Sequence, residues 1–80
     1  MARYFFHSKN GKVTLDEEGL ELADIDAVRE EAYFFGRETV WATPVSEFWA
    51  GESQSVWVTD GPNATGETIL RLELSATSSP

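Results

Sequence analysis

The stretch that decides the fold covers residues 3–15 and reads Arg3-Tyr4-Phe5-Phe6-His7-Ser8-Lys9-Asn10-Gly11-Lys12-Val13-Thr14-Leu15. An aromatic-rich segment, an Asn-Gly pair and a second short segment are the pattern of two strands joined by a tight turn. A two-residue turn at Asn10-Gly11 pairs Phe6 with Leu15 and so predicts which side chains share a face. The residues expected on one face are Tyr4, Phe6, Val13 and Leu15, and those expected on the other are Phe5 and His7.

A helix is predicted from Ile25 to about Thr43, where apolar residues recur at helical spacing. Asp24 is a residue type that commonly caps a helix N-terminus, and Pro44 provides a stop. Before the helix, Leu20-Glu21-Leu22 alternates in the manner of a short extended edge strand.

The second half predicts another hairpin, with strands at Gln54–Thr59 and Glu67–Leu74 joined by residues 60–66. Its alternation predicts that five apolar residues face the helix: Val56, Val58, Leu70, Leu72 and Leu74. Residues 44–53 follow neither period and are predicted to be an ordered loop. The whole pattern predicts an α+β fold, a small and mostly antiparallel sheet in β-β-α-β-β order with one helix packed on one face. We expect one domain over residues 1–74 and a disordered tail over residues 75–80.

Composition limits the partners that the chain can bind. Fourteen acidic and six basic residues among 80 leave a formal net charge of -8. That charge repels phosphate backbones, so we expect no direct nucleic-acid binding, and it favours solubility or a basic partner. Without cysteine there is neither a disulfide framework nor a thiolate metal site. No signal peptide or membrane-spanning run is visible, so we expect a cytoplasmic protein without membrane contact.

The opening segment, the turn that follows it and the start of the helix together resemble an uncharacterised family of short bacterial proteins, a domain of unknown function. The residues that carry this resemblance are Arg3-Tyr4-Phe5-Phe6-His7, Gly11, Asp16-Glu17-Glu18-Gly19 and Leu22 to Ala32. Val58-Thr59-Asp60-Gly61 and the closing Leu-rich strand match more loosely. The resemblance implies a small single-domain protein and carries no activity with it.

Catalytic and metal-binding patterns find little support. His7 is the only histidine, and the register brings Asp16 near it, which would suit a general base. No nucleophile stands at a recognisable spacing, so we interpret His7 as a histidine on the strand surface. The acidic residues from Asp16 to Asp26 lack the spacing and central glycine of a calcium loop. We therefore expect no enzyme activity, no metal and no cofactor.

Aromatic residues provide the stronger functional signal, since ten of the 80 residues are aromatic. On the helix, Phe34 and Trp41 are seven residues apart and lie opposite the core stripe. On the sheet, the alternation turns Phe5, Trp57 and Ile69 away from the helix. Large apolar side chains of this kind dominate protein interfaces.

We therefore expect a non-enzymatic protein-association module that forms a homodimer. Its predicted sheet anchors are Phe5, Trp57 and Ile69, and Phe34 and Trp41 form a second candidate surface. In a simpler interpretation, Val45, Phe48 and Trp49 of the 44–53 loop cover one of these surfaces. A third interpretation is an acidic, antitoxin-like or regulatory subunit that binds a basic protein through residues 16–31.

Overall fold

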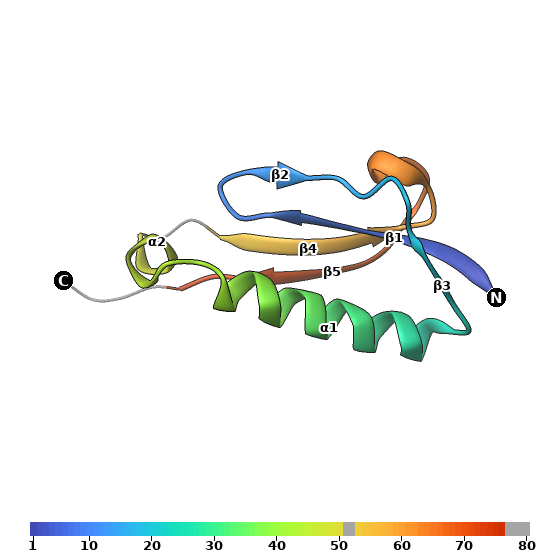
Figure 1. Ribbon diagram of the computed structural model, residues 1–80, viewed down its shortest axis with the longest axis horizontal. Helices are drawn as coiled ribbons and strands as arrows, with labels where there is room; N and C mark the ends of the chain where they lie inside the picture. Colours follow the sequence, from blue (N-terminus) through green and yellow to red (C-terminus); the bar gives the residue numbers. More distant parts are fainter. Residues whose placement is uncertain (51–52, 77–80) are drawn as a thin grey trace.

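A five-stranded antiparallel sheet carries one long helix on one of its faces in the computed structural model, which describes residues 1–50 and 53–76 (Figure 1). The elements follow one another as β1 (Ala2–Lys9), β2 (Val13–Thr14), β3 (Leu20–Leu22), α1 (Ile25–Trp41), α2 (Val45–Trp49), β4 (Gln54–Thr59), the 3-10 turn η1 (Pro62–Ala64) and β5 (Thr68–Leu74). The expected α+β class is confirmed, and the order of elements along the chain is roughly the expected β-β-α-β-β, with β3 and the short α2 in addition. No helix of the described part of the chain is long and apolar enough to cross a membrane.

The sheet has the order β2-β1-β4-β5, and β3 pairs with the other end of β1. β1 and β4 form its centre, with Phe6 opposite Val58 and Ser8 opposite Val56. Among the residues that the structure describes, β5 pairs with β4 alone, so it forms one edge, and β2 forms the other. The two-residue β2 and the three-residue β3 both pair with β1 on the side away from β4, each with a different end of β1.

The first hairpin differs from its predicted register by one residue. Ser8 faces Thr14 and Lys9 faces Val13, so Asn10, Gly11 and Lys12 form a three-residue loop. A two-residue type I′ turn needs positive φ at both central residues, whereas here Gly11 has φ 84° and Asn10 does not have a positive φ. A one-residue shift turns every side chain of the second strand over. Val13 and Leu15 were expected to share a face with Tyr4 and Phe6. Because of the shift they do not, and both side chains are exposed.

The core lies between α1 and the sheet. Val28 and Ala32 of α1 pack on Val58 of β4, and all three are buried. A ring of partly buried apolar side chains surrounds this cluster: Tyr4, Phe6, Leu22, Ile69 and Leu70. The predicted inward positions Val56 and Val58 are confirmed as core residues. Fully burying side chains of this size stabilises the fold by roughly 1.5–3 kcal/mol each.

Both ends of α1 agree closely with the sequence prediction. The Asp24 carboxylate accepts a hydrogen bond from the Ala27 N–H at 2.9 Å, so Asp24 is the N-cap. The helix ends at Trp41, two residues before the predicted end, and Ala42 forms the C-cap. Gly36 lies against β5, where a Cβ would come within 2.6 Å of Leu72 Cδ2.

Residues 44–53 were predicted to be a loop, and this is wrong for Val45–Trp49, which form the short helix α2. Pro44 occupies its N-cap position, where a missing backbone N–H costs nothing. Residues 51 and 52 of the predicted loop lie outside the described residues, as do residues 77–80 of the predicted tail.

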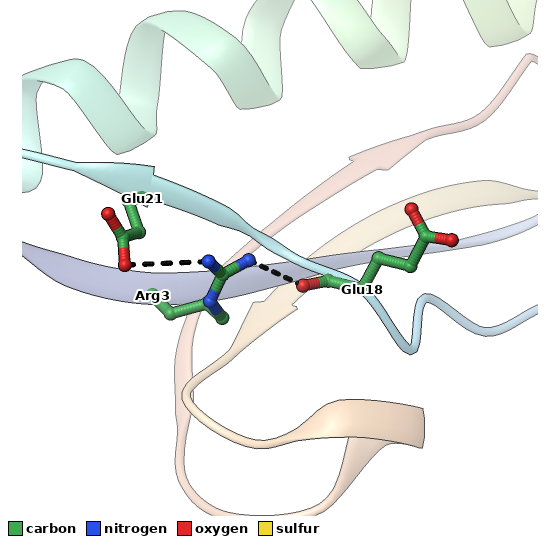
Figure 2. Close-up of polar contacts among 3 residues, drawn as sticks. All are labelled: Arg3, Glu18 and Glu21. Atoms are coloured by element: carbon green, nitrogen blue, oxygen red, sulfur yellow. Dashed lines mark hydrogen bonds and ion pairs between the residues drawn. The ribbon is translucent and has the colours of Figure 1, made fainter.

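The face of β1 that points away from α1 is covered, which was not expected. In Figure 1 the segment from β2 to β3 and the turn η1 lie on the opposite side of β1 from α1. Arg3 fastens this segment, because its guanidinium donates to the Glu18 carbonyl at 2.7 Å and pairs with the Glu21 carboxylate at 3.4 Å (Figure 2). Gly19 then lies directly against Phe5, close enough that a Cβ would meet the Phe5 ring at 2.8 Å.

Candidate functional site

The sequence offered two kinds of site, and the first is the environment of His7. Its ring is fully buried, which corrects its prediction as a surface histidine. Nδ1 of His7 lies 3.0 Å from the backbone N–H of Asp16, and Nε2 lies 2.8 Å from Oγ1 of Thr59. The predicted neighbour Asp16 is therefore present, but it reaches His7 through its backbone and not through its carboxylate.

The hydrogen bonds determine the tautomer of His7. The backbone N–H of Asp16 can only donate, so Nδ1 is an acceptor. The Thr59 hydroxyl donates its single proton to the Gly61 carbonyl at 2.7 Å, so Nε2 of His7 must donate to the Thr59 oxygen. His7 is thus a neutral imidazole with its proton on Nε2.

Asp16 joins three segments around this histidine. Its carboxylate accepts hydrogen bonds from the backbone N–H groups of Phe6, Glu18 and Gly19 at 3.1–3.2 Å. Its carbonyl accepts from the Asn63 N–H of η1 at 2.8 Å. Asp16 therefore holds β1, the 16–19 turn and η1 together.

Electrostatics favour the neutral histidine and the ionised aspartate. Burial lowers the pKa of His7 below its ordinary value of 6.5, and the nearby Asp16 charge offsets part of this effect. Burial alone would raise the pKa of Asp16, but its three backbone hydrogen bonds and the neighbouring His7 outweigh burial and lower the pKa below 3.8. A ring with no exposed surface and both nitrogens occupied does not reach a substrate, so we assign this network a structural role.

The second kind of site is the set of predicted sheet anchors, and the structure does not gather them into one exposed patch. Phe5 is only 6 % exposed, because Gly19 and its neighbours cover it. Ile69 was expected to point away from the helix, but it packs on the cluster of Val28, Ala32 and Val58. The β-bulge between Val58 and Thr59 shifts the pairing beside Ile69, which explains why simple alternation placed it wrongly.

Trp57 is the one sheet anchor on the expected face, and it is half-buried. The Arg71 guanidinium lies 5.2 Å from its ring centroid on one side, and the His7 ring lies 5.4 Å away. These contacts cover much of the indole, as expected for a cation–π pair beside a packed ring. Trp57 therefore presents less apolar surface than the alternation predicted.

The predicted helix anchors, Phe34 and Trp41, are both exposed. Trp41 is the more exposed of the two, with 89 % of its surface accessible to solvent. Phe34 is 40 % exposed, with the Arg37 guanidinium 5.3 Å from its ring centroid. Three further exposed apolar side chains were not predicted as anchors: Tyr33, whose ring packs on that of Phe34, and Val45 and Trp49 of α2. We call these five residues, Tyr33, Phe34, Trp41, Val45 and Trp49, the aromatic surface. α2 does not cover Trp41, which stays 89 % exposed although α2 begins only four residues after it.

A groove runs from this surface to the sheet edge. It has a volume of about 280 Å³ and is lined by Tyr33, Gly36, Arg37, Val40 and Trp41 of α1 and by Leu72 and Leu74 of β5. Leu72 was predicted to face the helix, and its contact with Gly36 confirms this. Gly36 has no side chain and lies between the larger Tyr33 and Val40 on the same face of α1. This glycine is the sequence signal that could have located the groove.

Charge on the surface is mostly acidic. The two ion pairs among residues 1–50 and 53–76 join Arg3 to Glu21 and Arg29 to Asp26. Besides the helix cap Asp24, four other carboxylates of the predicted acidic surface are exposed: Glu17, Glu18, Glu30 and Glu31. Over the same described residues, no three histidine or acidic side chains are grouped as metal ligands.

Fold and surface together define a small α+β domain, an antiparallel sheet with one helix, a structural histidine and an exposed aromatic surface. The chain belongs to the family described as a domain of unknown function, DUF6894, whose model matches residues 3–75. The predicted membership of an uncharacterised family is thereby confirmed. Comparison with curated proteins and with solved structures gives no match.

Proposed function

We propose that this protein is a non-enzymatic protein-association module that forms a homodimer through its aromatic surface. The observation that carries the proposal is Trp41, a tryptophan 89 % exposed in an 80-residue protein. Exposing a side chain of this size to water forfeits roughly 2–3 kcal/mol of burial energy, which association recovers. Tyr33 and the groove beside Trp41 extend the same surface.

A small core supports self-association as the form of this contact. Three hydrophobic residues form the buried cluster between helix and sheet. An 80-residue chain buries only about 60–65 % of the surface that its unfolded form exposes. A second copy adds burial that is absent from the monomer, and a homodimer couples folding to protein concentration.

The test is the mass of wild type and of Trp41→Ser in solution, measured by sedimentation velocity. We expect a wild-type dimer and a folded Trp41→Ser monomer. The matched control is Leu15→Ser, which removes an exposed apolar side chain from the β2 side of the sheet and should remain dimeric. A folded Trp41→Ser variant that dimerises as well as wild type contradicts the proposed surface.

The second candidate function is an acidic subunit that binds a basic protein. It is favoured by four exposed carboxylates of residues 16–31 that neither cap α1 nor have an ion-pair partner within residues 1–50 and 53–76: Glu17, Glu18, Glu30 and Glu31. Asp16 is not available to such a partner, because its carboxylate binds three backbone N–H groups. Binding of this kind weakens steeply as salt rises. Capture of a basic protein at low salt, lost in a Glu17→Gln/Glu18→Gln variant, would support it.

A further inference from the structure

The outer edge of β5 is the feature that this proposal develops. β5 pairs with β4 on one side, and on its other side no strand pairs with it within residues 1–50 and 53–76. No residue of β5 is fully buried, whereas four of the six residues of β4 are. An edge strand with a free row of backbone donors and acceptors is a template for another strand.

We propose that two copies of the chain pair β5 with β5, antiparallel, about a two-fold axis that passes beside Leu72. This inference rests on the proposed homodimer and specifies its geometry. The two sheets would then form one continuous sheet across the dimer. A two-fold axis makes the contact isologous, so every pair of facing residues occurs twice.

The charge pattern of β5 is complementary to itself in this register. When Leu72 faces Leu72 of the second copy, Arg71 faces Glu73 of the second copy, and Glu73 faces its Arg71. Arg71 and Glu73 are both exposed and lie on the face away from α1, one residue to either side of Leu72. A shift of the register by two residues loses both of these opposite-charge pairs and sets Arg71 opposite Arg71, or Glu73 opposite Glu73, of the second copy.

The apolar side chains of β5 are equally self-complementary. In the same register Leu70 faces Leu74 of the second copy, so Leu70, Leu72 and Leu74 form a row across the axis on the face toward α1. Leu72 and Leu74 line the groove beside α1. The second copy therefore supplies leucine side chains to an opening that is already lined by apolar groups.

The same two-fold axis relates the two copies of α1. It runs alongside β5 in the same direction (Figure 1), and Gly36 packs directly on Leu72. An axis at Leu72 brings the two α1 helices together near Gly36, in antiparallel orientation. Tyr33 and Trp41 lie three and five residues to either side of Gly36, so the axis brings Tyr33 of each copy toward the Trp41 end of the other. The pairing of β5 thus brings Tyr33 and Trp41, two members of the aromatic surface, toward the contact between the copies.

The test exchanges charge on β5 in steps. Glu73→Arg places arginine opposite Arg71 of the second copy, and Arg71→Glu places glutamate opposite Glu73. Arg71→Glu also removes the guanidinium from the Trp57 ring, but both side chains are exposed, so both variants should fold, which far-UV circular dichroism checks. Two like-charge pairs replace two opposite-charge pairs in each dimer, so we expect the dissociation constant to rise at least about ten-fold for each variant. The double variant Arg71→Glu/Glu73→Arg restores the pairing and should return close to the wild-type value.

The matched control for Glu73→Arg is Glu17→Arg, which makes the same change of net charge in the loop after β2, beside the opposite edge of the sheet. It should leave the dissociation constant unchanged. A wild-type dimer that is insensitive to both single variants, or a double variant that is as weak as the singles, overturns the β5 register but leaves the aromatic homodimer standing. A wild-type chain that is monomeric at every concentration overturns both proposals.

Discussion

At the scale of single residues, the most constrained side chain is His7. Its Nε2 proton and its Nδ1 lone pair are both committed, to Thr59 and to the Asp16 backbone. A second proton would have to enter at Nδ1, where it would face the N–H of Asp16. Only the neutral ring therefore fits this network. Protonation of His7 at low pH would disrupt the junction between β1, the 16–19 turn and η1.

This network makes stability depend on pH in a direction that can be stated. The folded pKa of His7 lies below 6.5, so the unfolded chain binds a proton that the folded chain does not. The contribution of His7 to the free energy of unfolding is fully present above pH 6.5 and is lost as the pH drops below that value. Asp16 acts in the same direction, but only as the pH falls below 3.8. Urea unfolding at about pH 7.5 and about pH 5 measures the histidine contribution.

His7→Gln separates this contribution from the others, because glutamine cannot titrate and His7 is the only histidine. We expect the variant to be less stable than wild type at neutral pH, by about 1–3 kcal/mol for the disturbed buried hydrogen bonds. Its loss of stability between the two pH values should be smaller than that of wild type. An equal loss in both proteins would contradict the assignment to His7.

Gly19 shows the second residue-scale constraint. It has φ +74°, and a Cβ there would meet the Phe5 ring at 2.8 Å. Gly19→Ala should therefore lower the free energy of unfolding by about 1–3 kcal/mol, from backbone strain and from contact with Phe5. Gly11→Ala is the control, because Gly11 also has a positive φ of 84° but lies in the exposed hairpin loop. If both variants lose the same stability in urea unfolding, the contact with Phe5 contributes nothing.

At the scale of elements, α1 depends on a single cap. Asp24→Ala removes the acceptor of the Ala27 N–H and should cost about 1 kcal/mol of stability. Asp26→Ala is the control at the same helix end, because Asp26 is exposed and makes only a long ion pair with Arg29 at 3.4 Å. Its cost should be no more than about half as large. Equal losses in urea unfolding would show that charge near the helix end, and not capping, stabilises α1.

The elements also show what local sequence can and cannot predict. Asp24 and Pro44 mark α1 because capping and helix termination act within a few residues. The first hairpin shifted by one residue because Asn10-Gly11 fits both a two-residue and a three-residue loop, and the choice depends on pairing outside the turn. The burial of Phe5 and His7 was missed for a related reason. Their covers, Gly19, Asp16 and η1, come from segments whose positions depend on the complete fold.

At the scale of the whole molecule, the exposure of the predicted anchors was predicted in part. Phe34 and Trp41 were found because a helix has a fixed period, so residues opposite the core stripe face outward. The prediction that Phe5 and Ile69 are exposed was wrong. Phe5 is covered on the outer face of the sheet, and the β-bulge beside Ile69 lets that side chain pack on the core cluster. The free edge of β5 could not be predicted, since strand order depends on contacts between segments that are distant in the sequence.

The homodimer is tested by the solution mass of the wild-type chain, measured by light scattering over a concentration series at low and high salt. We expect a dimer whose mass is nearly the same at both salt levels, because the aromatic surface and the β5 leucines contribute more to the contact than the Arg71–Glu73 pairs. A mass of one chain at every concentration and at both salt levels would contradict it.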